Sequence, residues 1–157
     1  MQSRETRSDK AEKPSAYEKA VMMLARREHS RHELMFKLTR DDYSADEASS
    51  AIDELIAAGL QSDERFCEVF IRSRVARGQG PIKIEAELRE RGIDSASIAL
   101  ELEAVAVDWR QLAGEALQKR FGTPPADMKE RARQLRFLAS RGFSGEHSYA
   151  AIDDFRE

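Results

Sequence analysis

The side chains best suited to chemistry are three histidines and one cysteine, and their spacing matches no common catalytic site. His29 and His32 are three residues apart and could share a helix face, but Ser30 lies between them in a helix-capping context. No HExxH or other metal-ligand spacing is present, so we expect surface histidines near helix ends. Cys67 lies on a predicted helix beside aromatic residues, which favours a small packing residue over a nucleophile. We therefore predict no catalytic residue and no metal site.

A glycine-containing turn is the other candidate for chemistry. Gly78 and Gly80 precede a predicted helix, whose first backbone N–H groups could hold a phosphate. The turn lacks the GxxxxGK pattern and a preceding strand, so a simple turn and helix start is favoured over a nucleotide site. We expect no cofactor and no enzymatic activity. An enzymatic alternative would depend on Cys67 and this turn alone.

Composition narrows the class of protein. The chain has 157 residues, 35% of them charged and 41% hydrophobic, with a formal net charge of −3. This total excludes a uniformly basic nucleic-acid coat, and the high charge is typical of an elongated helical chain. One cysteine excludes an intramolecular disulfide, no run of 18 apolar residues could span a membrane, and the charged N-terminus has no apolar signal region. We expect a cytoplasmic protein whose residues 1–14 form a disordered tail.

The sequence repeats with a period of 50 residues. Leucines recur at positions 38, 88 and 138, and a turn residue follows four positions later as Asp42, Gly92 or Gly142. Each unit is predicted to contain one helix, a second helix ending at the turn, and a third helix beginning at a capping residue. The predicted fold is all-α: an elongated tandem array of three three-helix, helix-turn-helix-like repeats at residues 15–60, 61–107 and 108–157.

Helix starts and inward faces follow from local patterns. Ser15, Ser30 and Ser44 are each followed three residues later by glutamate, the pattern of a capping box. The first helix is expected over residues 16–27 and the sixth over residues 94–107. The side chains expected to face the cores include Ala20, Val21, Leu24, Ala25, Ile52, Leu55, Ile56, Phe66, Val69, Phe70, Ser73, Ile84 and Leu88.

Charge is unevenly distributed along the chain. Residues 41–64 contain eight acids and no base, whereas residues 65–91 and 110–141 carry net charges of +3 and +5. Lys129, Arg133 and Arg136 fall on one helical stripe with Arg131 beside it, which favours contact with a polyanion or an acidic partner. A second candidate surface contains Arg72, Arg74 and Arg77.

Two other features qualify this interpretation. After Pro81, the pairs Lys83–Glu87, Glu85–Arg89 and Glu87–Arg91 are spaced i,i+4, which favours a self-paired solvated face. Three-helix units with a tight turn also resemble helix-turn-helix DNA readers in topology, but the candidate reading helices are acidic. Any direct DNA contact should therefore be weak and made mainly to the backbone.

Several longer segments resemble the RecX family, regulators of the bacterial RecA recombinase. They are MLARREHSRHEL at 23–34, GLQSDERF at 59–66, FIRSR at 70–74, RGQGP at 77–81, KERAR at 129–133 and RGFS at 141–144. The resemblance covers about residues 16–154. Phe36 departs from the basic residues that family members often carry there, so either an exposed apolar contact or packing on a neighbouring helix is expected. Asp42 in place of glycine is a milder departure.

The resemblance implies a monomeric negative regulator that binds RecA and its filament on single-stranded DNA. Such a protein would lie in the helical groove of the filament and inhibit filament extension, recombinase, ATPase and coprotease activities. The alternative is a stand-alone DNA-binding regulator with helix-turn-helix-like repeats. The residues expected to contact RecA or DNA are Arg72, Arg74, Arg77, Lys83, Lys129, Arg131, Arg133 and Arg136.

Overall fold

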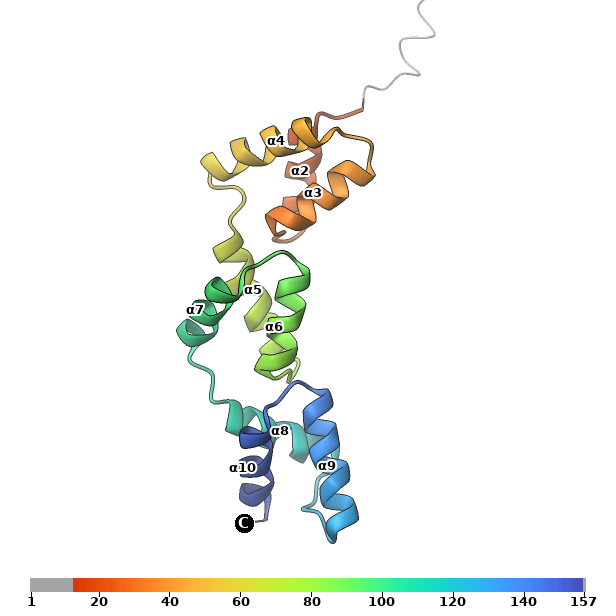
Figure 1. Ribbon diagram of the computed structural model, residues 1–157, viewed down its shortest axis with the longest axis vertical. Helices are drawn as coiled ribbons and strands as arrows, with labels where there is room; N and C mark the ends of the chain where they lie inside the picture. The colour runs from red at the N-terminus through yellow and green to blue at the C-terminus, as the bar shows by residue number, and fades with distance from the viewer. Residues whose placement is uncertain (1–12, 157) are drawn as a thin grey trace, which may run out of the picture. The chain divides into compact units, whose positions relative to one another are not determined.

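The computed structural model describes residues 13–156, which form nine α-helices and no strand (Figure 1). The tail predicted for residues 1–14 lies outside this range except for its last two residues. The predicted all-α class, with three-helix units in tandem, is confirmed. The helices are α2 (Ala16–Leu24), α3 (Arg31–Arg40), α4 (Ala45–Ala57), α5 (Asp63–Ala76), α6 (Pro81–Glu90), α7 (Ser95–Val105), α8 (Trp109–Arg120), α9 (Met128–Ser140) and α10 (Gly145–Phe155).

The predicted serine caps are present. Ser15, Ser30 and Ser44 each accept a hydrogen bond from the backbone N–H three residues later, and Ser30 completes a reciprocal capping box with Glu33. Two helices end earlier than expected. α2 ends at Leu24, and α7 ends at Val105 because the following residue is in the left-handed conformation. Side-chain caps therefore predict where a helix begins more accurately than apolar patterns predict where it ends.

The 50-residue period is visible in the hydrogen bonds of the turns. Position 42, 92 or 142 has a φ of 70°, 83° or 94°, and the next backbone N–H donates to the carbonyl of Leu38, Leu88 or Leu138 at 3.1 Å each time. A left-handed residue at that position lets the chain reverse and satisfies one terminal carbonyl of the helix. Asp42 therefore adopts the same turn as the two glycines.

The chain divides into two compact units, residues 1–63 and 64–157. The described part of the first unit has one core, formed by α2, α3 and α4 around Leu34, Leu38 and Ile52. The second unit contains two cores. One gathers α5, α6 and α7 around Ile84 and Leu88, and the other gathers α8, α9 and α10 around buried residues that include Leu117, Leu138 and Ile152.

Several predicted inward faces are wrong. Val21, Ile56 and Val69 have exposed fractions of 36%, 42% and 48%, and Ser73 and Ala25 are also exposed. On α5 Phe66 is buried as predicted, but the other buried side chains are Cys67 and Ile71, not Val69 and Ser73. Helix α5 carries apolar residues on several sides, so its own pattern is compatible with more than one rotation, and packing against α6 and α7 decides which side is buried.

Helix α6 differs from most of its neighbours because its N-cap residue, Gly80, has no side chain to cap it. The turn of the third repeat supplies the missing acceptors. The N–H of Gly80 donates to the carbonyl of Arg141 at 2.7 Å, and that of Ile82 donates to the carbonyl of Gly142 at 3.0 Å. A Cβ at Gly80 would collide with the Gly142 carbonyl, and one at Gly142 would collide with Lys83. Glycine at both positions permits this close approach of the second and third repeats.

Candidate interaction surface

The predicted basic stripe lies on the outside of α9. Lys129, Arg133 and Arg136 are exposed and Arg131 is half-buried. We call these four residues the basic face of α9. Within residues 13–156, none of them forms an ion pair. Their positive charge is therefore available to an anionic partner.

Aromatic rings lie beside this basic face. The Arg131 guanidinium is 5.3 Å from the centre of the Tyr149 ring, and Tyr149 on α10 is 51% exposed. The Arg133 guanidinium is 5.8 Å from the ring of Phe121. These contacts restrain long arginine side chains without neutralising them. Rings among arginines are also the combination with which proteins bind single-stranded nucleic acid.

The second predicted surface is less available than the first. Arg72 pairs with Glu68 at 2.7 Å, although its side chain remains 72% exposed. Arg74 is only 18% exposed, pairs with Glu87 at 3.0 Å and lies over the Phe70 ring at 4.5 Å. This contact joins α5 to α6 inside the second repeat. Arg74 thus has a structural role that its sequence context did not indicate.

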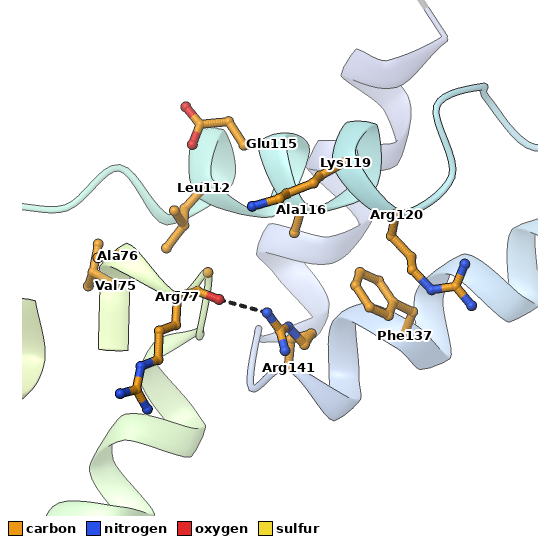
Figure 2. A pocket seen from close by; sticks show the side chains of 11 residues that line it. Val75, Ala76, Arg77, Leu112, Glu115, Ala116, Lys119, Arg120, Phe137 and Arg141 are labelled. Carbon is orange, nitrogen blue, oxygen red and sulfur yellow. Dashed lines mark hydrogen bonds between the residues drawn. The ribbon is translucent and has the colours of Figure 1, made fainter. Parts of the chain in front are cut away.

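Arg77 and Lys83 lie where the second and third repeats meet. Arg77 is exposed, and its carbonyl accepts a hydrogen bond of 2.7 Å from Nη2 of Arg141 (Figure 2). Lys83 is half-buried beside the turn at Gly142. No described hydrogen bond or ion pair joins either side chain to the basic face of α9. No described contact therefore joins the eight predicted residues into one site.

The predicted self-pairing of α6 is only partly correct. Arg89 pairs with Glu85 at 3.1 Å, as its i,i+4 spacing indicates. Glu87 instead pairs with Arg74 on the neighbouring helix, and Arg91 donates to the Glu87 backbone carbonyl at 2.9 Å. A tertiary partner held close by packing thus replaces the local partner.

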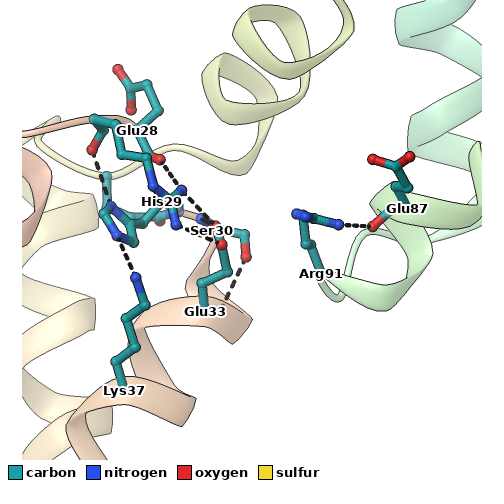
Figure 3. Close-up of polar contacts among 9 residues, drawn as sticks. Glu28, His29, Ser30, Glu33, Lys37, Glu87 and Arg91 are labelled. Carbon is teal, nitrogen blue, oxygen red and sulfur yellow. Dashed lines mark hydrogen bonds and ion pairs between the residues drawn. The ribbon is translucent and has the colours of Figure 1, made fainter. Parts of the chain in front are cut away.

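His29 is a correction to the expectation of surface histidines. Its exposed fraction is 3%, and it lies in a polar cluster of the first unit (Figure 3). Nδ1 lies 3.0 Å from the Arg27 carbonyl and must donate to it, so Nε2 accepts from Nζ of Lys37 at 3.1 Å. Burial and the cations of Arg27 and Lys37 lower the pKa of His29. Gln61 closes the cluster by donating to the His29 carbonyl. A contact between residues 32 positions apart leaves no local pattern from which burial could be predicted.

Phe36, which departs from the family pattern, is 62% exposed and so does not pack into the core. Cys67 is buried in the core of the second repeat, as expected of a packing residue. Among the described residues, no group of three or more His, Cys, Asp and Glu side chains is arranged to hold a metal ion. None of the described helices combines the length and apolar character needed to cross a membrane.

Comparison with known proteins identifies the family. Models of the first, second and third three-helix domains of RecX match residues 16–55, 62–100 and 108–152. The chain is 51% identical over 127 residues to the regulatory protein RecX of Chromohalobacter salexigens, covering 81% of this chain and 84% of that protein. The chain belongs to the RecX family.

Other RecX proteins agree with this assignment. The RecX of Halorhodospira halophila is 44% identical over 133 residues, covering 84% of this chain and 83% of that protein. The crystal structure of RecX from Lactobacillus salivarius superposes with a TM-score of 0.76 over 89% of this chain and 94% of that one. At 23% identity that likeness concerns the fold. The family is one of regulatory proteins.

Proposed function

We propose that this RecX-family chain is a negative regulator of RecA that acts in the cytoplasm as a monomer without catalysis. It binds RecA and its filament on single-stranded DNA in the helical groove, and inhibits filament extension and the recombinase, ATPase and coprotease activities. Membership of a family of regulatory proteins supports the regulatory role. The observation that carries the proposed contact is the basic face of α9, three of whose four residues are exposed and none of which has an acidic partner among the described residues.

A tandem array suits a repetitive partner. We propose three repeats at residues 15–60, 61–107 and 108–157, each offering its own surface to the filament. Individually weak contacts on one chain add through effective concentration, so a modest contact per repeat supports tight binding overall. The basic face of α9 is the main contact, and Arg72, Arg77 and Lys83 contribute a second one. Arg74 is expected to act by holding α5 to α6 rather than by touching the partner.

The test is RecA ATPase activity and strand exchange on single-stranded DNA with substoichiometric amounts of the full chain. We expect inhibition by the wild type and much weaker inhibition by Arg133→Glu plus Arg136→Glu, with unchanged helicity. The matched control is Arg40→Glu plus Arg89→Glu, because both arginines already pair with a carboxylate in their own repeat, at 3.6 and 3.1 Å. It should inhibit like the wild type. Absence of inhibition by the wild type at any ratio would contradict the proposed function.

A stand-alone DNA-binding regulator is the competing function, favoured by the three-helix units. Helix α4, the third helix of the first repeat, argues against it because it carries four acids and no base. Such a helix would be repelled by phosphates on either side of a major groove. Sequence-specific duplex binding at physiological salt, without RecA, would establish this alternative in place of the proposed function.

A further inference from the structure

A pocket of about 570 Å³ lies between the second and third repeats, within the second compact unit (Figure 2). The end of α5 and the following turn form one wall, and α8 and α9 form the others. Aliphatic side chains and one aromatic ring contribute the apolar lining: Val75, Ala76, Leu112, Ala116 and Phe137. A volume of this size is typical of ligand pockets and accommodates a few side chains of a docked segment.

The pocket is also cationic. Lys119, Arg120 and Arg141 line it, and Glu115 is its single carboxylate. In Figure 2 the Glu115 side chain points away from Arg141, and it accepts a hydrogen bond from Gln111. The surplus of cations over an apolar surface attracts a negatively charged group to the pocket.

Arg141 carries a charge that the described residues leave unneutralised. It is half-buried, and its Nη2 donates to a neutral carbonyl, that of Arg77, at 2.7 Å. Its Nε is fully buried without a hydrogen-bond partner, and no described carboxylate forms an ion pair with it. Because no described carboxylate neutralises this half-buried guanidinium, its charge attracts an anion that enters the pocket.

The aromatic ring in this pocket is poorly placed to receive a nucleic-acid base. The Arg141 guanidinium lies 5.9 Å from the centre of the Phe137 ring, and Phe121 packs edge-to-face against that ring at 5.4 Å. The rest of the apolar lining is aliphatic and suits aliphatic side chains. Single-stranded nucleic acid is normally held by open aromatic faces, which this pocket does not offer.

We propose that this pocket is a docking site for an acidic, amphipathic segment of a protein partner. An apolar side chain of the segment enters between Leu112, Ala116 and Phe137, and a flanking carboxylate pairs with Arg141 or Lys119. This is recognition of an amphipathic helix in a groove, with charge complementarity at the rim. The proposal is independent of the contact made by the basic face of α9.

The experiment measures fluorescence anisotropy of a labelled twelve-residue peptide of Glu, Ala and Leu, with two leucines four positions apart, titrated with the full chain. The titration itself contains no RecA and no DNA, so failure here is distinct from failure of the proposed function. We expect binding that weakens at least tenfold, about 1.4 kcal/mol, when the leucines become serine or the glutamates become glutamine. Equal binding of the serine peptide would show simple charge attraction and overturn the proposal, as would no binding of the parent peptide.

Three variants locate the site. Lys119→Glu plus Arg120→Glu should abolish binding, whereas Arg133→Glu plus Arg136→Glu makes the same change in net charge on α9 and should preserve it. Arg141→Gln removes the charge together with the Nη2 donor to the Arg77 carbonyl, and it should weaken binding at least tenfold. Circular dichroism checks that each variant is folded. Three results would overturn the proposal. The first is loss of peptide binding in the α9 variant alone. The others are displacement of the peptide by a thymidine oligonucleotide and displacement of the peptide when the chain associates with itself.

Discussion

The junction between the second and third repeats makes a sharp prediction for Gly80→Ala. Gly80 has a φ of −83°, which alanine adopts without strain, so the main effect of the substitution is on the contact with the third repeat. The new Cβ would collide with the carbonyl of Gly142 and force the turn away from α6. The two hydrogen bonds that would then be lost run from the N–H groups of Gly80 and Ile82.

Two backbone hydrogen bonds contribute about 1–3 kcal/mol to the free energy of unfolding. For a unit of this size, a loss of 2 kcal/mol lowers the melting temperature by about 8–16 °C. The assays are urea and thermal unfolding followed by circular dichroism, together with hydrogen exchange at Ile82, which should accelerate. Gly114→Ala on α8 is the control, because a Cβ at Gly114 would have no neighbouring atom within 4 Å. It should stabilise the protein by about 0.5–1 kcal/mol. An unchanged melting temperature and unchanged exchange at Ile82 in Gly80→Ala would refute the reasoning.

Three other predictions concern the cores and the buried polar groups. Leu88→Ala removes a fully buried side chain and should lower the free energy of unfolding by about 2–5 kcal/mol in urea; a negligible change would mean that Leu88 is not core. Glu87→Gln leaves the Arg74 guanidinium without its carboxylate and should cost about 1–3 kcal/mol in the same assay, against little change for Glu85→Gln. The pKa of His29 is lowered from 6.5 in the folded chain, so the unfolded chain binds the proton first and the first unit should lose stability as the pH falls below about 6.5. His29→Gln should reduce the change in the free energy of unfolding with pH. An equal pH dependence in both proteins would contradict this prediction.

The helix order was predictable because its signals are local. Ser30 and Ser44 begin helices through their own side chains, and a left-handed residue at position 42, 92 or 142 ends the helix before it. Packing faces were less predictable. Val69 and Ile71 are two positions apart on α5, and only the position of α6 and α7 makes the second one buried.

The candidate surfaces were predictable to a different extent. The basic face of α9 follows from spacing alone, because all four residues belong to one helix. Arg74 could not be assigned in this way, since Glu87 lies on another helix. The pocket beside Arg141 is also tertiary, since it brings Val75 close to Phe137 across more than 60 positions of sequence. Sequence spacing predicts sites within an element, whereas sites between elements require the fold.

The turn that completes the start of α6 has a consequence for how the repeats can be rearranged. The three repeats resemble interchangeable modules, yet the second one is complete only when residues 141–142 of the third lie beside it. A chain shortened before residue 141, or one in which the second repeat is moved to the C-terminus, would begin α6 with two amide groups that lack acceptors within the protein. Backbone hydrogen bonds thus make the start of α6 depend on the third repeat following the second. A protein in which these two repeats were exchanged would need a different N-cap at position 80.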